Sequence, residues 1–193
     1  MDVTKCIYKQ SDGQIRRVLG LFACLFALSC LAMVGCGSSQ GSASTRGFGI
    51  DAQQTSKESS RTEIRDVNDV PDALTESMKE VKGCKMTLEP DSSDYCYLYE
   101  DSDRVGAVEL SEDTDSFTVY IDSDRSGESS DRALERVAHM TLASVLACNP
   151  DYDYSKAQDV AVKIIEADDE YRDGKISYKA GTKSYQYVLL VYL

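Results

Sequence analysis

The chain has 193 residues, enough for one ordinary domain with additional segments, and 42% of them are apolar, which is typical of a globular protein. It contains 33 acidic and 21 basic residues and has a formal net charge of −12. A nucleic-acid partner needs a basic surface that releases counterions. The charge therefore argues against this class of partner.

The N-terminal segment has the charge layout of a secretory signal peptide. An uncharged apolar run, Val18–Val34, follows four basic residues: Lys5, Lys9, Arg16 and Arg17. A membrane-spanning helix needs about 20 apolar residues, so this run is at the short limit for a span. An uncleaved membrane anchor is therefore the second interpretation.

The apolar run ends in Met33-Val34-Gly35-Cys36. This junction resembles the lipobox of bacterial lipoproteins, a short aliphatic and small stretch that closes on a cysteine, with Met33 at the position where Leu is usual. The resemblance implies a diacylglyceryl group on Cys36, cleavage after Gly35 and a location on the extracytoplasmic face of a cell membrane. Cys24 and Cys30 are rival junctions, but apolar residues continue past both, whereas the chain turns polar after Cys36.

The composition divides the chain into three parts. We expect a signal peptide over 1–35, a lipidated cysteine with a flexible Ser/Gly-rich tether over 36–61, and a single domain over 62–193. Cleavage leaves 17 basic and 31 acidic residues, a formal charge of −14. Anionic headgroups repel such a body, so the two lipid chains on Cys36 must hold it at the membrane.

The first half of the domain predicts one helix followed by strands. Asp69 and Pro71 indicate a helix over 71–82 that ends before Gly83. Alternating apolar residues between acidic turns then predict a four-stranded antiparallel meander. Its strands are Cys84–Glu89, Tyr95–Glu100, Val105–Leu110 and Ser116–Ile121.

The second half predicts two helices and a hairpin. One helix begins at Ser130 and ends at Asn149 and Pro150, and another begins at Ser155 and ends before Gly174. The strands Ile176–Ala180 and Ser184–Leu193 flank a predicted turn at Gly181-Thr182. Together these elements predict an α+β fold, an antiparallel sheet of meander and C-terminal hairpin with helices packed on one face.

His139 is the one histidine of the chain. It lies five residues after Leu134, about 140° from the apolar stripe of its helix, so we expect it to face solvent rather than to act in catalysis. Cys148 is nine residues further along, roughly 13 Å away and on the opposite side. These two residues therefore cannot form a thiolate–imidazolium pair.

Three cysteines lie in the domain: Cys84, Cys96 and Cys148. Cys84 and Cys96 are predicted to point to the core from adjacent strands, on either side of a turn over Pro90–Ser93. A Cys84–Cys96 disulfide is therefore the pairing that strand geometry favours, with Cys148 buried beneath its helix. The alternative is that all three are unpaired thiols that pack as small apolar side chains.

The acidic turns indicate a candidate calcium site. The segment DSDRSGESSDRA begins with the oxygen-donor spacing of a calcium loop but has Ala133 where the final Glu should stand. A shorter segment with the same initial spacing, DSDRVG, is predicted to lie at the same end of the meander. The predicted Ca²⁺ ligands are Asp101, Asp103, Asp122, Asp124 and Ser126. The alternative is that these residues form ordinary solvated turns.

Tyr95, Tyr97 and Tyr99 share one face of a predicted strand, and Tyr120, Tyr185 and Tyr187 are candidates to extend the row. Exposed tyrosines are common where proteins bind peptides, glycans or other proteins. The alternative is that the rings pack beneath a helix.

The function we predict is that of a lipid-anchored cell-envelope protein that acts through binding rather than catalysis. A Gly-rich phosphate loop, a GxSxG motif and an HExxH motif are absent from the sequence. Two alternatives stay open. One is a calcium-stabilised module, and the other is an envelope hydrolase with two carboxylates in a pocket.

Overall fold

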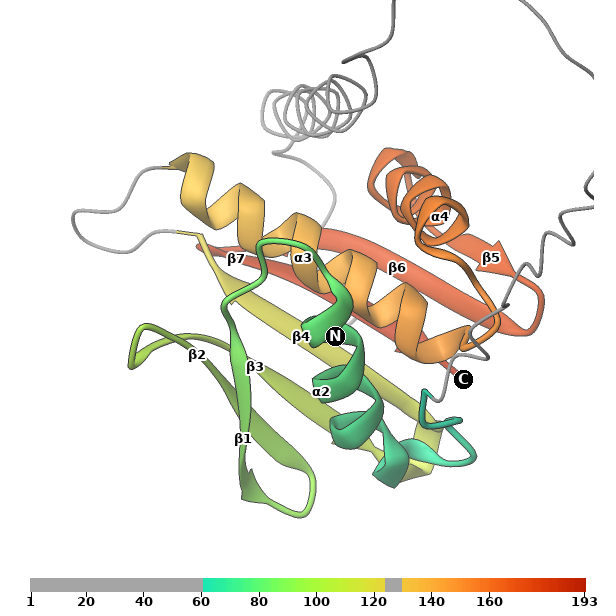
Figure 1. The fold of residues 1–193 in the computed structure, drawn as a ribbon, viewed down its shortest axis with the longest axis horizontal. Helices are drawn as coiled ribbons and strands as arrows, with labels where there is room; N and C mark the ends of the chain where they lie inside the picture. The colour runs from blue at the N-terminus through green and yellow to red at the C-terminus, as the bar shows by residue number, and fades with distance from the viewer. Residues whose placement is uncertain (1–60, 124–129) are drawn as a thin grey trace, which may run out of the picture.

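The computed structural model describes residues 61–123 and 130–193 (Figure 1). Seven strands form one antiparallel sheet in the order β1-β2-β3-β4-β7-β6-β5, and the three α-helices of the described residues lie in front of it. The predicted α+β fold is confirmed. The predicted signal peptide, lipid-attachment site and most of the tether lie outside the described residues. Among the described helices, none is long and apolar enough to cross a membrane.

The elements of the first half are η3 (Val67–Asp69), α2 (Val70–Glu80), β1 (Thr87–Ser92), β2 (Tyr95–Glu100), β3 (Asp103–Ser111), η4 (Glu112–Thr114) and β4 (Ser116–Asp122). Those of the second half are α3 (Ser130–Cys148), α4 (Tyr154–Glu166), β5 (Tyr171–Asp173), β6 (Ile176–Lys183) and β7 (Gln186–Tyr192). The order and antiparallel pairing of β1 to β4 are as predicted. The C-terminal strands join it through the β4–β7 pair, in which Phe117 lies opposite Val191 and Val119 opposite Leu189.

Helix α3 forms the centre of the core. Every residue from Arg136 to Ala147 is buried, and Met140, Ala143 and Leu146 are fully so. A helix buried all round must be covered on several sides. The sheet covers α3 on one side, and α2 and α4 pack against it on its flanks (Figure 1).

His139 is 7% exposed, so the prediction that it faces solvent is wrong. The prediction assumed a helix with one covered side, whereas the segment that follows α2 covers a second side. A Cβ placed on Gly83 would lie 3.7 Å from the imidazole Cε1 and Nε2 atoms, which shows how closely the Gly83 backbone packs against this ring. Gly83 also has a φ of +87°, a backbone conformation that side chains with a Cβ rarely adopt.

The first strand begins three residues later than predicted, at Thr87 instead of Cys84. Pro90, predicted to begin a turn, lies within β1, and the turn to β2 falls at Ser93 and Asp94. β1 is an edge strand, where the missing N–H of proline can face solvent. By contrast, β2 has the predicted bounds Tyr95–Glu100.

The helix predicted to begin at Ser155 and to end before Gly174 is shorter in the structure. It begins at Tyr154, where the Asp153 side chain caps it by accepting a hydrogen bond from the Lys156 N–H at 2.7 Å, and it ends at Glu166. The residues assigned to its last turn form the strand β5, in which Tyr171 pairs with Tyr178 of β6. Sheet pairing therefore outweighs the helical spacing of Tyr171.

The hairpin turn also lies further along the chain than predicted. Gly181 and Thr182 belong to β6, and the turn falls at Ser184-Tyr185, with Ser184 at a φ of +55°. Glycine and threonine in this segment indicated a turn, but continued pairing of β6 with β7 as far as Lys183 extends the strand.

Substitution of Gly106 tests how closely β3 and β4 pack. A Cβ on this residue would lie 2.1 Å from the backbone oxygen of Tyr120, a contact that only movement of β3 or β4 can relieve. We expect Gly106→Ala to lower the free energy of unfolding by about 3 kcal/mol, at the upper end of the usual cost of overpacking. Urea unfolding of the protein beginning at Gly37 measures this change.

Gly174→Ala is the matched control. Gly174 has a φ of +63° but nothing within 4 Å of its Cβ position, so its substitution costs only backbone strain, about 1 kcal/mol. Equal losses for the two variants would contradict the packing argument for Gly106.

Candidate binding face

The side chains of β2 alternate between the two faces of the sheet. Cys96, Leu98 and Glu100 are buried on the helix side, while Tyr95, Tyr97 and Tyr99 are half-buried on the other side. The rings of Tyr95 and Tyr97 meet edge to face with centroids 5.3 Å apart, and those of Tyr97 and Tyr99 do so at 6.4 Å. We call the surface around this row the tyrosine face.

The neighbouring strands complete the tyrosine face. Tyr97 lies between Glu89 of β1 and Ala107 of β3, and Tyr95 lies opposite Glu109 of β3. In β4, Tyr120 lies opposite Ala107, so two tyrosines stand on either side of a small residue. The tyrosine face is therefore defined by Glu89, Tyr95, Tyr97, Tyr99, Arg104, Ala107, Glu109 and Tyr120.

Tyr120 joins the face through a hydrogen bond, since its hydroxyl donates to the Glu109 carboxylate at 2.8 Å. Burial, with a further contribution from this bond to Glu109, raises the pKa of Tyr120 to about 12. The phenol therefore stays protonated and keeps donating at every physiological pH. The bond ties β4 to β3 on the side of the sheet that the described helices do not cover.

Two tyrosines that sequence analysis proposed for the row lie elsewhere. Tyr187 points to the helix side, where its hydroxyl lies 3.3 Å from the Thr141 hydroxyl of α3. Its position opposite Ile121 puts it on the buried face, so its proposed place in the row is wrong. Tyr185 is 69% exposed in the β6–β7 turn, outside the row.

The turns that contain Asp101 and Asp122 lie at the same end of the sheet, as predicted, but both carboxylates have protein partners. The Asp101 carboxylate lies 3.6 Å from the Arg132 guanidinium, and the Asp122 carboxylate accepts a hydrogen bond from the Gln186 amide at 2.9 Å. Among the described residues, no cluster of three or more His, Cys, Asp or Glu side chains is arranged to hold a metal ion. Asp124 and Ser126 lie outside those residues, so the calcium loop stays a prediction.

The three cysteines of the domain are free thiols in the structure. Cys84 precedes β1, and the residue opposite Cys96 in β1 is Pro90, so Cys84 and Cys96 are not a cross-strand pair. Burial raises the pKa of all three thiols, that of Cys148 to about 12. A protonated thiol is a weak nucleophile, so these environments disfavour covalent chemistry at the cysteines.

A buried ion pair that sequence analysis missed joins β2 to α3. The Glu100 carboxylate lies 2.7 Å from Nε of Arg136 and 3.1 Å from a terminal nitrogen of Arg132. The Glu100 and Arg136 side chains are 8% and 5% exposed. The signal was present in the sequence, since Glu100 stands at an inward position of β2 and buried charges are almost always paired.

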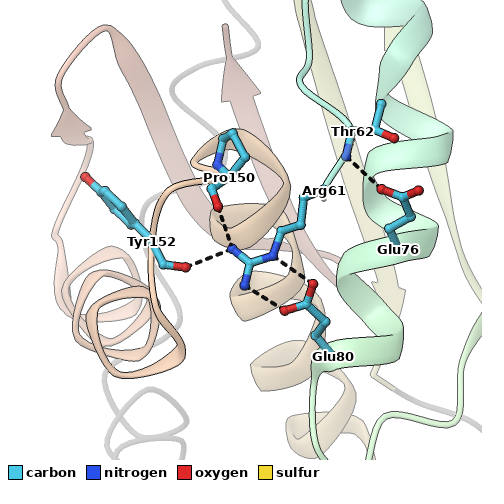
Figure 2. Close-up of polar contacts among 6 residues, drawn as sticks. All are labelled: Arg61, Thr62, Glu76, Glu80, Pro150 and Tyr152. Carbon is cyan, nitrogen blue, oxygen red and sulfur yellow. Dashed lines mark hydrogen bonds and ion pairs between the residues drawn. The ribbon is translucent and has the colours of Figure 1, made fainter. Parts of the chain in front are cut away.

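Arg61 fastens the beginning of the described chain to the helix layer (Figure 2). Its Nε and one terminal nitrogen donate to the two carboxylate oxygens of Glu80 at 2.8 and 2.6 Å. Its other terminal nitrogen donates to the carbonyl oxygens of Pro150 and Tyr152 at 3.1 and 2.8 Å. One guanidinium thus joins the end of α2 to the α3–α4 loop, and Arg61 belongs to the domain rather than to the predicted tether.

No protein-family model, curated protein or solved structure matches this chain.

Arg61→Ala tests the contribution of this contact. The substitution removes four hydrogen bonds, two of them to a carboxylate, and we expect the free energy of unfolding to fall by about 2 kcal/mol. Arg65→Ala is the matched control, because the Arg65 side chain is 81% exposed and its ion pair with Glu63, also exposed, is as long as 3.9 Å. Urea unfolding compares the two variants, and an equal loss for both would contradict the role of Arg61.

The burial of His139 predicts how the free energy of unfolding changes with pH. Burial lowers the pKa of His139 below 6.5, against the opposing effect of Glu135 and Glu100. As the pH falls through 6.5, the unfolded chain therefore binds a proton that the folded chain does not, and the free energy of unfolding falls. The loss levels off below the folded-state pKa.

The measurement is urea unfolding at pH 7.5 and pH 5.5 for the unsubstituted protein and for His139→Gln. No other histidine contributes in this range. We expect the unsubstituted protein to lose more stability than the variant between the two pH values. An equal loss in both proteins would show that His139 is not buried in its neutral form.

Proposed function

We propose that this chain is a lipid-anchored protein on the extracytoplasmic side of a cell membrane, whose domain binds a partner through the tyrosine face. The observation that carries the binding role is the uneven covering of the sheet. The helices α2, α3 and α4 cover one side, and the described residues place no helix over the row of half-exposed tyrosines. Tyrosine offers a large rigid surface with a polar tip, which suits a binding surface in contact with water.

The chemistry of the titratable groups supports binding over catalysis. His139 is buried with a lowered pKa, and the cysteines have raised pKa values. The buried carboxylate Glu100 is already paired with two arginines. Groups in these states maintain the fold and are poorly suited to transfer protons or attack a substrate. A calcium-stabilised module and an envelope hydrolase stay as alternative hypotheses.

Membrane attachment through Cys36 agrees with the place where the chain joins the domain. Arg61 is held at the edge of the helix layer (Figure 2), and 24 residues, many of them Ser or Gly, separate it from Cys36. A flexible chain of that length has an r.m.s. reach of about 25 to 30 Å. Such a tether would let the domain stand clear of the lipid headgroups and leave the tyrosine face open to a partner.

Substitution of the cysteine tests the anchor. The full chain is expressed in a bacterium fed a labelled fatty acid, and its extracts are partitioned between detergent and aqueous phases. We expect the unsubstituted chain to carry label and enter the detergent phase, and Cys36→Ser to carry no label. Cys30→Ser, at a rival junction, is the matched control and should behave like the unsubstituted chain. Label retained in Cys36→Ser, or lost in Cys30→Ser, would contradict attachment at Cys36.

A further inference from the structure

The meander that carries the tyrosine face is strongly acidic. Between Thr87 and Asp122 there are eleven acidic residues and one basic residue, Arg104. Glu89 and Glu109 are exposed on the tyrosine face itself, opposite Tyr97 and Tyr95. The turns at both ends of the meander add further carboxylates. A partner that lies on this surface therefore meets a negative potential along its whole length.

Arg104 shows that the tyrosine rings can contact a cation. Its guanidinium carbon lies 5.0 Å from the centroid of the Tyr97 ring, which is the geometry of a cation–π contact. The one basic side chain of the meander thus rests on the central tyrosine of the row. The same rings and the neighbouring carboxylates would attract arginine or lysine side chains of another molecule.

The spacing of the row fits an extended peptide. Successive ring centroids are 5.3 and 6.4 Å apart. Alternate side chains of an extended strand lie about 6.6 Å apart on one side of the chain. A peptide that runs parallel to the row would therefore bring every second side chain level with a successive ring.

Building on the function proposed above, we propose that the tyrosine face binds an extended segment of a partner protein in which arginine or lysine occupies alternate positions. The cations lie on the rings of Tyr95, Tyr97 and Tyr99, where the one on Tyr97 replaces the Arg104 guanidinium, and Glu89 and Glu109 flank them. The backbone of the segment follows the direction of β2. Charge complementarity brings the segment to the acidic meander, and the aromatic row sets the register.

The test uses the full chain purified in a non-ionic detergent and fluorescein-labelled peptides with alternating sequences. Arg-Thr repeats of eight residues are the probe, Glu-Thr repeats are the charge-reversed control, and citrulline-Thr repeats are a neutral control of the same shape. Fluorescence anisotropy at low and at 300 mM salt gives the affinities. We expect binding of the Arg-Thr peptide alone, weakened by salt.

Two variants locate the contact. Tyr97→Thr removes the central ring but keeps a residue favourable in a strand, and we expect about fivefold weaker binding. Glu89→Gln removes one exposed charge, and we expect weaker binding with a smaller salt dependence. Tyr185→Thr is the matched control, because Tyr185 is exposed outside the row, and it should leave the affinity unchanged. Thermal unfolding followed by circular dichroism verifies that each variant is folded.

Several outcomes would overturn the inference. The inference would be wrong if the folded protein did not bind the Arg-Thr peptide. It would also be wrong if Tyr185→Thr and Tyr97→Thr weakened peptide binding equally. Citrulline-Thr binding as strong as Arg-Thr binding, and sensitive to Tyr97→Thr, would reject a cationic partner while keeping the tyrosine face as a binding surface. Competition of soluble phosphocholine with the peptide, in the same detergent, would assign the face to lipid cations instead.

Discussion

Burial of helix α3 is the constraint on which the rest of the structure depends. A helix whose residues from Arg136 to Ala147 are all buried cannot be stable alone, because most of its favourable free energy comes from surfaces that other elements must supply. The sheet supplies one of these surfaces and the two flanking helices supply the others. All three helices are thereby gathered on one side of the sheet, and the tyrosine face is left on the other.

The buried ion pair between Glu100 and Arg136 fixes α3 relative to β2. Removing two charges from water costs more free energy than the attraction of an isolated ion pair recovers. Such a pair therefore needs good geometry and additional partners. Arg132 supplies a second cation to the same carboxylate. Because Glu100 and Tyr99 are adjacent on β2 and point to opposite faces, the contact that positions α3 also holds the end of the tyrosine row in place.

The places where sequence analysis succeeded and failed have identifiable physical causes. β2 alternates strictly and has no proline, and its bounds were predicted correctly. The end of β1 was misplaced because Pro90 is tolerated in an edge strand, and the edge position is known only from the sheet order. Tyr171 has a spacing that suits a helix, but its pairing with Tyr178 depends on a partner strand that local periodicity does not reveal. His139 was placed outside because a helical wheel counts one covered side, whereas α3 has several.

The sequence by itself determined the α+β class, the four-stranded meander, the shared face of the three β2 tyrosines and the acidic character of the domain. These properties follow from the spacing of apolar residues along short segments and from the amino-acid composition, and neither depends on contacts between distant residues. Tertiary structure decided which face the helices cover, where Arg61 is held, and that Glu100 is paired with Arg132 and Arg136. Those features join residues 19 to 91 positions apart along the chain, and only packing of the whole core brings such residues together.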